Sequence, residues 1–123
     1  MVALAVLPAG VVIERVETAA NPQQSYALYL PSRYSPDRQW PVLYCLDPLA
    51  RGRVAVERFA HAAERAGVIV VGSNNSRNGP TEPVRDALVA MVQDTHERFS
   101  IDDSRAFAAG YSGGARMALL WAR

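Results

Sequence analysis

Residues 110–114 read Gly110-Tyr111-Ser112-Gly113-Gly114, which matches the pattern G-x-S-x-G. The pattern stands between a predicted buried strand, residues 105–110, and a predicted helix, residues 113–123. A serine on such a sharp strand-to-helix turn has a strained backbone and an exposed hydroxyl. Small residues two positions before and after it let the strand and the helix pass close together. We therefore predict that Ser112 is a nucleophile and that Gly110 and Gly114 form its elbow.

The amide of Gly113 points from the predicted helix N-terminus to the place where an oxyanion develops during acyl transfer. Two other interpretations remain open: a purely structural Gly-Ser turn, and a phosphate-binding helix N-terminus assisted by Arg116. The segment follows the last predicted strand and matches neither of the common glycine patterns for phosphate binding. Gly113 is therefore predicted as one donor of an oxyanion hole.

The rest of the sequence predicts alternating strands and helices. Apolar and β-branched runs predict strands at residues 11–18, 25–30, 40–46 and 68–73, and apolar positions at helical spacing predict helices over 54–66 and 82–99. The first two strands are joined by a polar turn, which is typical of an antiparallel pair. The order β-β-β-α-β-α-β-α predicts one continuous domain with a sheet covered by helices on both faces.

Composition excludes several classes of protein. The 123 residues are 50% hydrophobic and carry a net charge of +1, so nothing predicts nucleic acid or an anionic membrane as partner. The single Cys45 lies in an apolar run, which predicts a buried, inert thiol and no multi-cysteine metal site. No run reaches the roughly 18 apolar residues of a membrane-spanning helix. The apolar start lacks a basic n-region, so we expect a soluble protein, either cytoplasmic or exported.

Three groups of residues carry a resemblance to a known family. They are the two strand segments Tyr26-Ala27-Leu28-Tyr29-Leu30-Pro31 and Trp40-Pro41-Val42-Leu43-Tyr44, and then Ile101-Asp102 with Arg105 before the serine elbow. Together they resemble the esterase D, feruloyl esterase and polyhydroxyalkanoate depolymerase group of α/β-hydrolases. The resemblance implies an α/β fold, the N-terminal half of an α/β-hydrolase, with a mostly parallel sheet, an antiparallel N-terminal hairpin and helices on both faces. It also implies a small-molecule or polymeric ester substrate, no metal and no organic cofactor.

The loop after residues 40–46 departs from that group, in which the strand commonly ends in His-Gly. Asp47 and Pro48 stand there instead, and because proline has no N–H, the amide of Leu49 becomes the predicted second oxyanion donor. We expect Asp47 to cap nearby amides rather than to act in catalysis, since Asp before Pro commonly begins a turn. Residues 73–76 either line the substrate cleft or close their own turn.

The acid and the histidine of a triad follow the serine in α/β-hydrolases. Residues 113–123 contain no Asp, Glu or His, while His61 and His96 precede the serine on predicted flanking helices. We therefore expect residues 1–123 to be a partial domain, truncated after the elbow helix and inactive alone. Its exposed sheet edge at residues 105–110 is expected to favour self-association. The alternative is a non-catalytic, hydrolase-like binding module.

Overall fold

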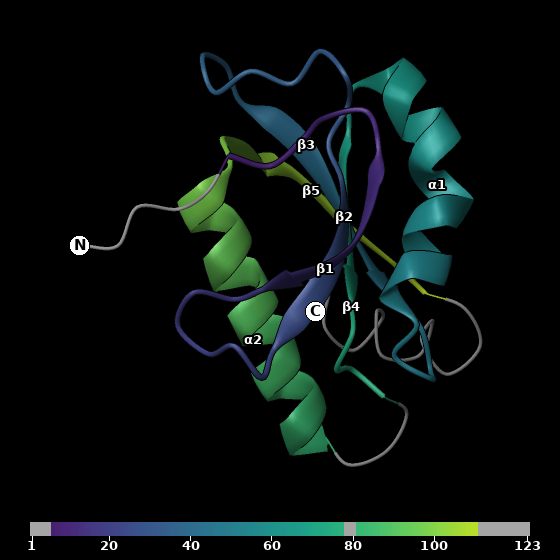
Figure 1. Ribbon diagram of the computed structural model, residues 1–123, viewed down its shortest axis with the longest axis vertical. Helices are drawn as coiled ribbons and strands as arrows, with labels where there is room; N and C mark the ends of the chain where they lie inside the picture. Colours follow the sequence, from purple (N-terminus) through teal and green to yellow (C-terminus); the bar gives the residue numbers. More distant parts are fainter. Residues whose placement is uncertain (1–5, 78–80, 111–123) are drawn as a thin grey trace.

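A computed structural model describes residues 6–77 and 81–110 (Figure 1). The elements are β1 (Val12–Glu17), β2 (Ser25–Tyr29), β3 (Trp40–Leu46), α1 (Gly52–Ala66), β4 (Ile69–Ser73), α2 (Thr81–Arg98) and β5 (Ile101–Gly110). Their order confirms the predicted order up to the last predicted helix, which lies outside the described residues. Of the two described helices, neither is long and apolar enough to cross a membrane.

The strands form one five-stranded sheet in the order β1-β2-β4-β3-β5. Strand β2 is antiparallel to β1 and to β4, whereas β3 is parallel to β4 and to β5. The predicted antiparallel hairpin is thus confirmed, and the sheet as a whole is mixed. Because β3, β4 and β5 run in the same direction, the loops that follow them leave from the same edge of the sheet. Of the residues predicted to form the site, the described ones, Leu49 and Gly110, belong to that edge.

Alternation along the strands divides the core into two layers, one on each face. The layer under α2 joins sheet residues such as Leu28, Val42 and Val71 to Val84, Leu88 and Met91 of the helix. The layer under α1 joins Ala27, Cys45 and Val70 of the sheet to Ala55, Val56 and Ala63. The two helices therefore cover opposite faces, as Figure 1 shows, which confirms the predicted α/β architecture.

Helix α1 begins in very close contact with the end of β4. A Cβ atom at Gly52 would lie 2.3 Å from the carbonyl oxygen of Gly72, and one at Gly72 would lie 2.5 Å from the carbonyl oxygen of Gly52. The helix ends as predicted at Gly67, which has φ +74° and donates its N–H to the Ala63 carbonyl at 2.8 Å. This close approach sets where the β3–α1 loop crosses the edge of the sheet.

Helix α2 is fixed to the sheet by a buried polar cluster. The carboxylate of Asp94, 3% exposed, accepts hydrogen bonds from the Tyr26 hydroxyl at 2.6 Å and from the Ala19 amide at 2.8 Å. Arg98 donates its Nε–H to the same carboxylate at 2.7 Å. Burial, followed by the hydrogen bond to Asp94, raises the pKa of Tyr26, so this hydroxyl stays protonated and keeps donating.

Strand β5 begins at Ile101 rather than at residue 105. Its pairing with β3 shifts between Trp40↔Ile101 and Val42↔Ala106, so residues 102–105 form an irregular segment. Asp102 organises that segment by accepting hydrogen bonds from the Ser104 amide at 3.0 Å and from Arg105 Nε at 2.7 Å. The turn-forming residues of this segment are why the sequence pattern indicated only the regular part of the strand.

Candidate active site

The parallel pairing of β3 with its two neighbours brings three segments together at one edge of the sheet. Leu46, the last residue of β3, is the Cα partner of Gly110, the last residue of β5. Next to them, Cys45 pairs with Gly72 of β4, and the loops beyond join through a bridge between Leu49 and Arg77. The β3–α1 loop therefore begins beside Gly110, the first residue of G-x-S-x-G. Ser112, Gly113 and Gly114 themselves lie outside the described residues.

Asp47 is the centre of the β3–α1 loop. Its carboxylate accepts a hydrogen bond from the Leu49 amide at 2.9 Å and one from the Arg51 amide at 3.3 Å. The Arg51 guanidinium adds two contacts of 2.9 Å, through Nε and Nη2. These contacts confirm the expected capping role of Asp47. The hydrogen bond from the Arg51 side chain and those from the two amides hold the pKa of Asp47 below its usual range, against the opposing effect of burial.

Every amide of residues 49–51 is engaged within the loop. Besides the amides of Leu49 and Arg51, the Ala50 amide donates to the Asp47 carbonyl at 2.9 Å. Ala50 has φ +57°, a left-handed conformation that a residue with a Cβ rarely adopts. The Leu49 amide, predicted as the second oxyanion donor, is thus bonded to a carboxylate of its own loop. That role stays a prediction, and it requires Asp47 to share or release this N–H.

The loop after β4 closes its own turn and binds the first residue of β2. Ser73 Oγ accepts hydrogen bonds from the amides of Asn75 and Ser76, each at 3.1 Å. Asn74 Nδ2 donates to Ser25 Oγ at 3.1 Å, and Asn75 Oδ1 accepts from the Ser25 amide at 2.9 Å. Of the two roles predicted for residues 73–76, the structural one is the one these contacts show. Among the buried side chains that the structure describes, the Ser76 hydroxyl and Gln24 Oε1 have no hydrogen-bond partner.

Both histidines lie far from this edge along their elements. His61 is exposed on α1, about 13 Å along the helix from Gly52, which marks the edge. His96 Nε2 lies 2.6 Å from Asp103 Oδ1, near the start of β5. Because Gly110 ends that strand, roughly 20 Å of chain separates Asp103 from the edge. The placement of both histidines on helices that flank the sheet is confirmed, whereas their distance from Ser112 stays a prediction.

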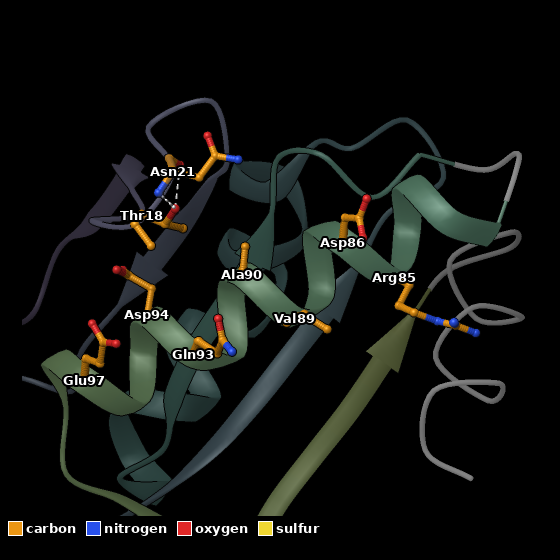
Figure 2. Close-up of a pocket in the computed structure, with 10 residues that line it drawn as sticks. Thr18, Asn21, Arg85, Asp86, Val89, Ala90, Gln93, Asp94 and Glu97 are labelled. Atoms are coloured by element: carbon orange, nitrogen blue, oxygen red, sulfur yellow. Dashed lines mark hydrogen bonds between the residues drawn. The ribbon is translucent and has the colours of Figure 1, made fainter.

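Two hollows lie near the helices. A cavity of about 540 Å³ adjoins the start of α1 and is lined by the loop residues Ala50, Arg51 and Gly52 together with Asn74. A second, of about 250 Å³, runs between α2 and the β1–β2 turn, where Thr18 and Asn21 face Ala90 and Asp94 (Figure 2). Of residues 73–76, which were predicted either to line the substrate cleft or to close their own turn, Asn74 lines the first cavity.

The thiol of Cys45 takes no part in this site. It is 1% exposed and lies in the layer under α1. Burial raises the pKa of this thiol to about 12, so it stays protonated at neutral pH. The predicted buried, inert thiol is therefore confirmed.

No family model matches the sequence, and no curated protein matches it. Solved structures do match. An acetyl xylan esterase from Aspergillus awamori is 20% identical, with a TM-score of 0.65 over 88% of this chain and 45% of its own. The fluorophosphonate-binding serine hydrolase F of Staphylococcus aureus is 18% identical, with a TM-score of 0.64 over 86% of this chain and 49% of its own. An S-formylglutathione hydrolase from Agrobacterium tumefaciens is 20% identical, with a TM-score of 0.57 over 78% of this chain and 46% of its own.

These comparisons establish the fold. The described residues have the architecture of the N-terminal half of an α/β-hydrolase, with its mixed sheet and its helices on both faces. The chain spans less than half the length of each of these three enzymes.

Proposed function

We propose that this chain carries the nucleophile half of a serine hydrolase that cleaves carboxylic esters through an acyl-enzyme on Ser112. The observation that carries the proposal is the pairing of Leu46 with Gly110. This pairing puts the start of the β3–α1 loop beside Gly110, the first residue of G-x-S-x-G, and so supports an oxyanion hole shared by this loop and the serine segment. The fold shared with esterases supports it.

The reaction would proceed by acyl transfer. A histidine from outside residues 1–123 takes the Ser112 proton, and the serine oxygen attacks the ester carbonyl. Negative charge on the carbonyl oxygen is stabilised by the amides of Gly113 and Leu49. The alcohol departs with the proton, and water then releases the acid and restores the serine. Substrates of the esterase D, feruloyl esterase and depolymerase type, small or polymeric esters, fit this chemistry.

A specific observation favours a second candidate, a non-catalytic binding module of hydrolase fold. Pro48 has no N–H, and the Leu49 amide is bonded to the Asp47 carboxylate. A loop built in this way presents no free backbone donor to a substrate oxygen among residues 48–51.

An assay with p-nitrophenyl acetate separates the two candidates. For the chain alone we expect almost no turnover. When imidazole is added to act as the base, we expect a burst of p-nitrophenol, and Ser112→Ala should abolish this burst. The absence of a burst that depends on Ser112 would favour the binding module. Full turnover without imidazole, lost in Ser112→Ala, would contradict the need for a histidine from outside the chain.

A further inference from the structure

The β3–α1 loop directs all of its backbone donors inward. Leu49 and Arg51 donate to the Asp47 carboxylate, Ala50 donates to the Asp47 carbonyl, and Pro48 has no N–H to give. The backbone donors of the loop therefore already bind an anion of the loop itself, the Asp47 carboxylate.

The Asp47 carboxylate is held tightly by its neighbours in the loop. The Asp47 side chain is 3% exposed and makes two contacts of 2.9 Å with the Arg51 guanidinium, an arrangement typical of strong charge-assisted pairs. The left-handed Ala50, between Leu49 and Arg51, shows that the surrounding contacts impose this loop conformation.

We propose that Asp47 is a positioning residue that keeps the Leu49 amide engaged and thereby limits the rate of acylation at Ser112. The inference rests on the proposed function. The neutral carbonyl of a bound ester competes poorly with a carboxylate for an N–H, whereas the charged oxygen of the transition state competes well. The contact thus leaves substrate affinity unchanged and slows the chemical step.

Two measurements on the chain in imidazole test this proposal: hydrogen exchange of the Leu49 amide, and the rate and concentration dependence of acylation by p-nitrophenyl acetate. In the unsubstituted chain the Leu49 amide should be protected. Asp47→Ala should release it, with exchange at least about tenfold faster. Acylation should then accelerate on the order of 10- to 100-fold with unchanged half-saturation, the scale of one oxyanion donor.

A second variant keeps the test valid if the loop of Asp47→Ala loses its conformation. Asp47→His combined with Pro48→Gly removes the carboxylate and adds a backbone donor, and it should accelerate acylation as well. Asp102→Ala is the matched control, because Asp102 also accepts from a backbone amide and from an arginine Nε, but at the start of β5. This control should lose stability without faster acylation.

The possible outcomes are distinct. A Leu49 amide that exchanges freely in the unsubstituted chain would overturn the proposal, as would equal or slower acylation in both Asp47 variants. Failure of every form to acylate Ser112 would instead overturn the proposed function, and this inference with it.

Discussion

Leu46 and Gly110 are direct Cα partners in the parallel pairing of β3 and β5. Strand β3 continues into Asp47 and its loop, and β5 ends at Gly110, the first residue of G-x-S-x-G, so two positions more than sixty residues apart in sequence are neighbours in the sheet. The candidate active site is thus a product of the strand order, in which β3 lies between β4 and β5.

The contact between Gly52 and Gly72 should tolerate no side chain. In Gly72→Ala the new Cβ would lie 2.5 Å from a backbone carbonyl oxygen, so α1 must shift away from β4. We expect the free energy of unfolding to fall by about 1–3 kcal/mol in urea denaturation. An unfolding free energy left unchanged by Gly72→Ala would contradict the close approach.

The Tyr26 hydroxyl should contribute to stability through Asp94. Removing it in Tyr26→Phe leaves the buried carboxylate with one donor fewer, which should cost about 1–3 kcal/mol of unfolding free energy. Tyr29→Phe offers a matched control, since the Tyr29 hydroxyl also donates to a helix carboxylate, that of Glu64, which is only half-buried. Equal losses of unfolding free energy in the two variants would contradict a larger contribution from the buried hydrogen bond to Asp94.

Glu64 should make stability depend on pH in the acid range. Hydrogen bonds from the Ser32 hydroxyl and amide and from Tyr29 lower the pKa of Glu64 from 4.5 to about 2. The unfolded chain therefore binds this proton at higher pH than the folded chain. The stability that the ionised carboxylate contributes is complete above pH 4.5 and is lost as the pH falls toward 2. Urea denaturation at several pH values should show a weaker dependence in Glu64→Gln, and an unchanged dependence would contradict this assignment.

Strand β5 should promote self-association of the chain. Among the described residues it pairs on one side only, with β3, and Phe107 is 56% exposed. We expect Phe107→Lys to lower the apparent mass in sedimentation velocity, because charge on an edge strand opposes pairing. Val89→Lys is the control, since Val89 is 49% exposed but lies on α2. A monomeric parent chain, or an equal effect of both substitutions, would contradict the role of the edge.

Local patterns predicted most of the fold. The apolar run at residues 40–46 matched β3 at both ends, because a strand buried on both faces is apolar throughout. Gly67 ended α1 as expected, because a left-handed cap favours glycine. The start of β5 was missed because Asp102 and Ser104 form a turn-like irregularity inside a strand.

The candidate site could be predicted only in part. The capping role of Asp47 followed from its place before Pro48, since a local side-chain contact depends on neighbours in sequence. That the Leu49 amide is among the donors bound to Asp47 depends on the direction of its N–H in the folded loop. The polar cluster around Asp94 joins Tyr26 to α2 across 68 positions, and no local pattern indicates such a contact.

The most direct test of the central claim is to locate the adduct that a fluorophosphonate forms on this chain in the presence of imidazole. Peptide mapping by mass spectrometry should find the phosphonyl group on Ser112, with none on Ser73, Ser76 or Ser104, and no adduct in Ser112→Ala. An unmodified Ser112, or equal modification of several serines, would contradict its assignment as the nucleophile.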